Sequence, residues 1–427
     1  MDVTINAISE VQQEAAIEVN NEELQPHFAK AYEKFRPKAQ LRGFRKGKVP
    51  LGMIKKLYGE AIEHDALDLI AEEVYRKAME ERNIRPLGQP AMVDMNFKRG
   101  ASFRFTVKYD VRPNVTLKDY KGLRIEKPVH PFTDQELEDE LLHLRRANST
   151  QTPATVVTDQ DYIVTADLQE VDEAGTPLIG KKSENMKFRL YDTSLAPEIR
   201  TTLRSAQVGG TYPVDVESKH EDHARHNRYR LTVTAIEKVE LPALDETLVR
   251  KLTGEKTTDV QEFKQSLRDD LNRYWQEQSA AQVRDAIADE IVRTHEFPVP
   301  ESLVNGFLDS FVEDIKSRSR TGALPKDFDE KKFRAENRAN AVWQAKWMLL
   351  KEGIAAAEHI ELTDEELDAM ATLEATRIGL DKERLMQYYR GSSTAKEKLL
   401  SDKILTFLVN NARITEKVVE PASGHQG

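Results

Sequence analysis

The sequence predicts an α+β multidomain protein, with an α+β N-terminal region, a small strand-rich middle region and a nearly all-helical C-terminal region. Three observations predict this fold class. The chain has 427 residues, more than one ordinary core holds, which indicates about three domains. Apolar and polar residues alternate with a period of two in parts of residues 1–112 and 151–240. Between residues 241 and about 413, apolar residues recur at helical spacing instead.

The composition supports extended helical structure and excludes cysteine chemistry. Charged residues make up 32% of the chain and aromatic residues only 7%, a balance that favours long, solvated helices over one compact globule. There is no cysteine, so disulfides and thiolate metal sites are excluded. The first residues lack the basic start and apolar stretch of a signal peptide, and no apolar run approaches the roughly 18 residues of a membrane span. We therefore expect a soluble, cytoplasmic protein.

The N-terminal region reads as strands, two helices and two closing strands. Residues 3–7 and 15–19 alternate as strands do, and Asn20 with Glu23 forms a capping-box pattern that begins a helix. A second helix is predicted before Pro86, followed by strands at about 91–97 and 102–111.

Beyond Pro113 the chain changes character several times. Thr133 and Glu136 form a second capping-box pattern and begin a helix in a connector. Short β-like runs then alternate with Gly, Pro and Asp, as in a small strand-rich domain. The long helical region follows, and the polar tail from about residue 415 is expected to be disordered.

A loop in the N-terminal region concentrates positive charge in an otherwise acidic chain. The formal net charge is −10, yet residues 30–56 contain ten basic residues and a single acid, Glu33. Two glycines in the loop permit backbone conformations that other residues avoid, and its proline can start the next helix. A phenylalanine among cations at a loop tip suits an apolar pocket beside anionic groups on a partner. The motif consists of Gly43, Phe44, Arg45, Lys46, Gly47, Lys48, Val49 and Pro50.

This octapeptide resembles the ribosome-binding signature of the bacterial trigger factor family. The resemblance continues through residues 57–59 and the turn at 84–86, then through 240–242 and 299–304. It covers the whole chain, and the regions follow one another in the order expected for the family. Eight residues in this context are far more specific than a bare Gly-x-x-x-Gly.

The resemblance implies a domain organisation and a set of partners. It implies a ribosome-binding domain at 1–112, a connector at 113–150 whose helix packs on the body, and an FKBP-like peptidyl-prolyl isomerase domain at 151–240. An elongated helical chaperone domain with arms would occupy 241–414, before the disordered tail at 415–427. The implied partners are a protein of the large ribosomal subunit beside the exit tunnel, with ribosomal RNA nearby, and nascent or unfolded polypeptides. No cofactor, nucleotide or membrane is expected.

The middle region departs from the family pattern at the pocket that would bind a prolyl ring. Residues 196–203 match an FKBP-like Gly-Phe-Glu-x-Gly turn, but Ile199 stands at the phenylalanine position and both glycines are lost. Leu168 replaces an aromatic residue of the first strand. The pocket candidates are Leu168, Phe188, Leu190, Ile199 and Leu203. We expect the fold to be kept and the isomerase activity to be weak, and we assign no catalytic residue.

Two local motifs allow other interpretations. Gly43-x-x-x-Gly47-Lys48 is one residue short of a phosphate-binding loop, and Val49 replaces the hydroxyl residue that would hold magnesium, so nucleotide binding is rejected. His220, His223 and His226 would lie near one face of a helix, but their polar surroundings favour a solvated loop over a metal site.

Three functions remain to be compared. The first is an ATP-independent chaperone that holds apolar nascent segments by many weak contacts. The second is a prolyl isomerase whose helical arms recruit its substrate. The third is an RNA-binding factor, which the net negative charge disfavours. The eroded pocket favours the first. The apolar stripes of the C-terminal helices are core by default, and the sequence alone does not separate covered positions from exposed ones.

Overall fold

The computed structural model describes the whole chain apart from residues 221–222, 320 and 420–427. The side chains of 217–226 are also outside the described part. The fold is α+β, with a strand-rich middle region and a helical C-terminal region, as the sequence predicts. The chain divides into two compact units, Met1–Ile125 with Arg284–Ile414, and Glu126–Val283 with Thr415–Gly427. The divisions fall inside β5 (Arg124–Val129), α6 (Val260–Thr294) and β11 (Arg413–Val418).

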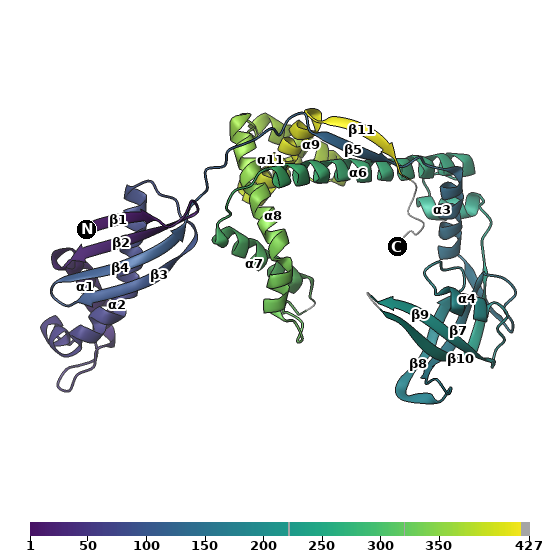
Figure 1. The fold of residues 1–427 in the computed structure, drawn as a ribbon, viewed down its shortest axis with the longest axis horizontal. Helices are drawn as coiled ribbons and strands as arrows, with labels where there is room; N and C mark the ends of the chain where they lie inside the picture. The colour runs from purple at the N-terminus through teal and green to yellow at the C-terminus, as the bar shows by residue number, and fades with distance from the viewer. Residues whose placement is uncertain (221–222, 320, 420–427) are drawn as a thin grey trace. The chain divides into compact units, whose positions relative to one another are not determined.

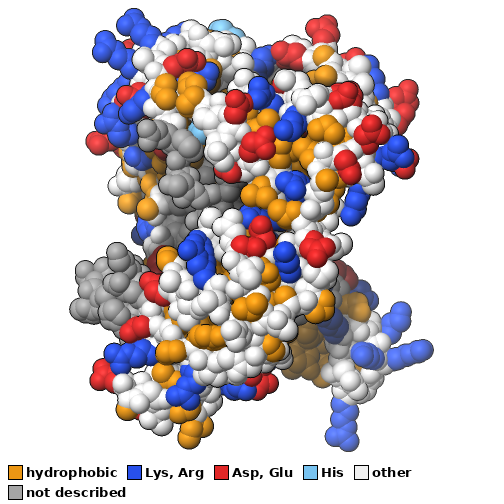
Figure 2. Space-filling model, turned by 90° about the vertical axis from the view of Figure 1, so that its right-hand side faces the viewer, with side chains coloured by type: hydrophobic (Ala, Val, Ile, Leu, Met, Phe, Trp, Pro, Cys, Tyr) orange, Lys and Arg blue, Asp and Glu red, His pale blue; other side chains and the backbone are white. Residues whose placement is uncertain are grey.

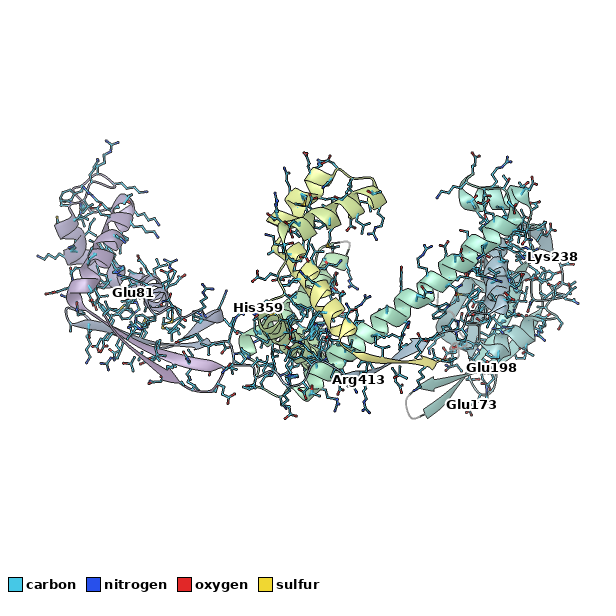
Figure 3. The ribbon with its side chains drawn as sticks, turned by 90° about the horizontal axis from the view of Figure 1, so that it is seen from above. Glu81, Glu173, Glu198, Lys238, His359 and Arg413 are labelled. Atoms are coloured by element: carbon cyan, nitrogen blue, oxygen red, sulfur yellow. The ribbon has the colours of Figure 1, made fainter. Side chains whose placement is uncertain are left out.

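The N-terminal part of the first unit is an antiparallel four-stranded sheet in the order β1-β2-β4-β3. Helices α1 and α2 cover one face of this sheet (Figures 1 and 3). The bounds are β1 Asp2–Ala7, β2 Gln12–Asn20, α1 Asn21–Phe35, α2 Leu51–Glu81, β3 Leu87–Lys98 and β4 Ser102–Asp110. The strands and helices expected here are confirmed.

Period-two burial and helix capping account for these elements. On β4, every second residue points into the core: Phe103, Phe105 and Val107 are at most 2% exposed. The Asn20 side chain accepts a hydrogen bond from the Glu23 N–H at 3.0 Å, and the Glu23 carboxylate accepts one from the Asn20 N–H at 3.2 Å. The predicted capping box is therefore formed, and it begins α1.

The rest of the first unit is mostly helical and includes two small apolar cores. Helices α7 and α8 share an apolar core that includes Val304, Leu308 and Ala341. Helices α9 to α11 enclose a second core around Leu367 and Tyr389. The bounds are α7 Glu301–Arg318, α8 Glu330–Ala357, α9 Asp364–Ile378, α10 Lys382–Gly391 and α11 Ser393–Asn410.

The second unit combines helical segments with a five-stranded sheet. Helix α3 (Asp134–Ala147) begins at the predicted Thr133–Glu136 capping box and packs on α5 (Glu246–Thr253) and on α6 through Leu137, Val249 and Phe263. In the sheet, β10 pairs with β7 on one side and with β9 and β6 on the other. The bounds are β6 Thr150–Ala154, β7 Tyr162–Val171, β8 Pro177–Arg189, α4 Pro197–Leu203, β9 Thr211–His220 and β10 His223–Glu240.

Two expectations need correction. The first residues of the predicted disordered tail form β11, which pairs with β5 and is tied to it by Lys417 Nζ and Glu126 Oε2 at 2.8 Å. This pairing joins residues almost 300 positions apart, a distance over which local sequence patterns carry no information. His220 lies at the end of β9 and His223 and His226 lie in the paired strand β10, not in a helix or a solvated loop. The side chains of all three lie outside the described residues.

None of the helices in the described residues combines the length and the apolarity that a bilayer crossing needs. Among the described side chains, no group of three His, Cys, Asp or Glu residues is arranged to hold a metal ion.

Candidate functional site

The basic loop is closed at its neck by backbone hydrogen bonds. After a short 3-10 helix at Arg36–Lys38, the Gly47 N–H donates to the Ala39 carbonyl at 3.1 Å. Two turns lie on this frame, with the Phe44 N–H donating to Leu41 at 3.0 Å and the Lys48 N–H donating to Arg45 at 2.9 Å. The loop therefore has a defined backbone path. It leads into the first turn of α2, at the end away from the sheet, and Glu81 lies at the other end of that helix (Figure 3).

The two glycines of the motif occupy left-handed backbone conformations. Gly43 has φ +95° and Gly47 has φ +77°, values that other L residues rarely adopt. A Cβ on Gly47 would also lie 3.4 Å from the Pro37 carbonyl oxygen, inside the neck of the loop. The prediction that the glycines shape this loop therefore has a backbone reason.

Burial separates the residues that anchor the loop from those that it presents. Val49 and Ala39 are each 1% exposed and belong to the core of the N-terminal sheet and helices. Phe44 is 39% exposed, although a side chain as large and apolar as phenylalanine is usually buried. Pro50 precedes the first residue of α2, and its carbonyl accepts from the Ile54 N–H at 3.2 Å. The loop is thus pinned at its base and offers an aromatic side chain at its tip.

The cations of the loop have no acidic partner in the part of the chain that the structure describes. Arg42, Arg45, Lys46 and Lys48 are exposed, and none has an ion-pair partner among the described residues. Two cations before the loop are paired, Arg36 with Glu33 at 3.5 Å and Lys30 with Glu73 at 3.7 Å. On the face in Figure 2, basic and acidic side chains are both spread over the surface. Such a tip attracts anionic surfaces, with a strength that falls as salt is added.

The structure brings the five isomerase-pocket candidates into one apolar cluster of the middle domain. Leu168 follows Val164 and Ala166 on the inner face of β7, and Phe188 lies opposite Val164 on β8. Ile199 and Leu203 lie one turn apart on α4, and Leu190 follows the end of β8. Residues from two strands and one helix therefore meet in this cluster.

Most of these candidates are core residues and not an open pocket floor. Leu203 is fully buried, Leu190 is 1% exposed and Phe188 is 6% exposed. Leu168 and Ile199 keep some exposed surface and pack against the edge of the cluster. Leu168 and Ile199 are aliphatic where the resemblance expects aromatic rings, so these two positions offer less flat contact surface.

The carboxylate of Asp167, beside this cluster, stabilises an irregularity in the pairing of β7 and β8. Asp167 accepts hydrogen bonds from the Asn185 N–H at 3.0 Å and from Lys182 Nζ at 3.0 Å, where the β7–β8 register shifts. These bonds, the Asn185 one first, hold the pKa of Asp167 below its usual value. Asp167 therefore serves the backbone and is not set up for proton transfer.

The structure also shows exposed apolar residues that the sequence did not identify. In α9, α10 and the turn between them, large apolar side chains lie on the outside of the small core around Leu367. Their spacing alone gives no signal, because exposure depends on which face the neighbouring helix covers. The most exposed are Met370 at 36%, Leu373 at 74%, Ile378 at 47%, Leu380 at 52% and Tyr388 at 58%.

Comparisons with known proteins agree with these features. The family model described as bacterial trigger factor protein matches residues 1–144, and the model of its C-terminus matches residues 259–410. The chain is 33% identical to a trigger factor of Salinibacter ruber, over 98% of this chain and 95% of the relative. It is 30% identical to one of Chloroherpeton thalassium, over 97% of each.

A solved structure gives a match of the fold. That structure, described as concerning promiscuous substrate recognition in folding and assembly activities of the trigger factor chaperone, matches with a TM-score of 0.50. The match covers 96% of this chain and 99% of the other at 18% sequence identity. Together with the relatives that span its length, these findings show that the chain belongs to the trigger factor family of ribosome-associated chaperones.

Proposed function

We propose that this protein docks on the large ribosomal subunit beside the exit tunnel through residues 43–50, and that it holds nascent or unfolded chains without ATP. The observation that carries the proposal is the loop itself, with Phe44 exposed at 39% among cations that have no ion-pair partner in the described part of the chain. Ribosomal RNA and an acidic pocket of a ribosomal protein offer the complementary surface. Work at the ribosome would place the protein in the cytoplasm.

The proposed division of labour follows the regions of the chain. Residues 1–112 would dock, 113–150 would connect, 151–240 would form the FKBP-like domain, and 241–414 would hold clients. The exposed residues of α9 and α10 support the last assignment, because apolar surface that the fold leaves uncovered is available to apolar chain segments. The similar fold described with promiscuous substrate recognition is consistent with a surface of this kind. Many weak apolar contacts also allow release without nucleotide hydrolysis.

The holding surface can be tested by changing Leu373, Ile378 and Leu380 together to serine. These side chains are 47 to 74% exposed, so the fold should survive. The concentration needed to halve aggregation of a denatured test protein should rise about tenfold, which corresponds to about 1.4 kcal/mol of lost binding free energy. The measurement is light scattering without ATP.

A matched control changes the same kind of residue elsewhere. Ile8, Val93 and Val208 are 46 to 51% exposed and are scattered over other elements, so their change to serine should leave the suppression of aggregation unaltered. Equal activity of the two triple variants would show that the helices α9 and α10 do not hold clients.

We propose that prolyl isomerisation by the middle domain is weak and secondary. The support is the aliphatic character of Leu168 and Ile199, together with the burial of Phe188, Leu190 and Leu203 in the core. A catalyst must bind the twisted X–Pro transition state better than the planar ground state, and this edge offers little surface with which to do so.

A further inference from the structure

A hollow of about 520 Å³ lies between α6 and α8 in the first unit, and both helices are labelled in Figure 1. The hollow is shallow and open to solvent. Neither the basic loop nor the exposed residues of α9 and α10 line it. The lining consists of Asp285, Asp289, Ala339, Asn340, Trp343 and Gln344.

Helical spacing explains why these side chains converge. Asp285 and Asp289 lie four residues apart on α6, so both carboxylates project from one face. Asn340, Trp343 and Gln344 are related in the same way on α8. One wall of the hollow is therefore acidic, and the other combines an indole with two carboxamides.

The acidic wall lacks a counter-charge. Neither Asp285 nor Asp289 has an ion pair with any described residue, and both are exposed. Other acids of the same helix are neutralised, as Glu290 is by Arg293 at 2.6 Å and Asp270 by Arg273 at 3.2 Å. Like charges one turn apart are unfavourable, so this pair is placed where a cation from outside would relieve it.

The indole ring of Trp343, on the other wall, has no cation over it among the described residues. Lys351 lies over the Trp347 ring at 5.6 Å, and Lys346 lies over the nearby Phe297 ring at 5.8 Å. Over Trp343, whose ring centroid is 6.4 Å from that of Trp347, no described cation is found. An indole is the best aromatic partner for a cation, and this one shares a hollow with two unpaired carboxylates.

We propose that this hollow binds a lysine or arginine side chain of a client polypeptide. The cation lies against the Trp343 ring and pairs with Asp285 and Asp289, while the carboxamide oxygens of Asn340 and Gln344 accept hydrogen bonds from its N–H groups. This inference rests on the proposed holding function and adds a charged subsite to it. A divalent metal fits less well, because the lining offers only two carboxylates and the indole is no metal ligand.

The test compares two labelled peptides on the full-length protein. Both are unfolded and rich in apolar residues, and they differ only in carrying arginine or its neutral isostere citrulline at the same positions. By fluorescence anisotropy, the wild-type protein should bind the arginine peptide roughly three- to thirty-fold more tightly, and added salt should reduce the difference. Asp285→Asn with Asp289→Asn should bring the ratio close to one while leaving the citrulline peptide's affinity unchanged.

A control on the same helix removes equal charge outside the hollow. Asp269→Asn with Asp270→Asn should keep the arginine preference, and Trp343→Leu should reduce it. Equal wild-type affinity for both peptides would overturn the proposed cation site and leave the holding function standing. If the wild-type protein bound neither peptide, both proposals would be overturned. If millimolar Mg²⁺ abolishes the preference while monovalent salt of equal ionic strength does not, the hollow is a metal site and the peptide proposal is wrong.

Discussion

Phe44 and Val49 lie in the same loop and have opposite surroundings, which separates docking from stability. Phe44→Ala removes an exposed ring and should change the free energy of unfolding by less than about 0.5 kcal/mol. Val49→Ala removes two buried carbons next to the core and should cost about 2 kcal/mol. Urea denaturation of both variants, set beside their ribosome affinity, checks the contrast. The account fails here if Phe44→Ala proves the more destabilising change.

Leu168 and Ile199 are the pocket residues with room to be enlarged. Both keep exposed surface at the edge of the apolar cluster, so Leu168→Phe with Ile199→Phe should fold without severe overpacking. The added ring surface should raise the isomerisation rate of a single-proline peptide roughly tenfold, a change of about 1.4 kcal/mol in barrier. Leu190→Phe, at a position 1% exposed, is the control and should destabilise the domain instead. Robust wild-type activity, equal to that of a dedicated isomerase, would contradict the weak-pocket proposal.

Individual residues could be predicted where the signal was contiguous. The loop motif is eight adjacent residues, and its glycines show the positive φ that the sequence argument required. The hollow could not be predicted, because Asp289 and Trp343 are more than fifty positions apart and meet only when α6 packs near α8. The exposure of Leu373 was equally hidden, since it depends on which face of α9 the next helix covers.

At the scale of elements, the start of α3 should respond to acid. Burial favours the protonated form of Glu136, but hydrogen bonds from the Thr133 N–H and from His130 outweigh it and hold the pKa of Glu136 below its usual 4.5. A carboxyl whose pKa is depressed in the folded state stabilises it above pH about 4.5, and that stability is lost as the pH falls through the folded value.

Glutamine at this position isolates the effect, because it also completes a capping box and does not titrate. Between about pH 6 and pH 3.5, the melting temperature of the wild-type protein should fall about 2–4 °C further than that of Glu136→Gln. Thermal unfolding followed by circular dichroism measures this difference. Parallel pH profiles for the two proteins would show that Glu136 does not contribute in this way.

Elements with local signals were predictable, and elements that depend on distant pairing were not. The capping boxes at Asn20 and Thr133 announce α1 and α3, because the hydrogen bonds that begin a helix join residues three apart. Strand β11 escaped prediction because its partner β5 lies almost 300 positions earlier in the chain and because its own side chains, including Ile414 and Val418, are exposed. From the sequence alone, its charged side chains indicate a solvated tail. The structure shows that one of them, Lys417, pairs with Glu126.

For the whole molecule, the functions are assigned to separate parts of the chain. The proposed docking loop lies in the N-terminal sheet-and-helix region, the proposed holding surface in α9 and α10, and the proposed isomerase pocket in the middle sheet. The first two belong to one compact unit, although almost the whole second unit separates them in sequence. We propose that docking and holding each rest on weak, reversible contacts, which would need no nucleotide.

The central claim is that the basic loop anchors the protein to the ribosome, and co-sedimentation with purified large ribosomal subunits tests it most directly. Phe44, Arg45 and Lys46 changed together to alanine should weaken binding roughly tenfold or more, because the apolar tip and two charges are lost together. The matched control changes Leu69, Arg76 and Lys77 to alanine, exposed residues of the same kinds further along α2, and should sediment like the wild type. Added salt should release the wild-type protein. Undiminished sedimentation of the loop variant would contradict the account.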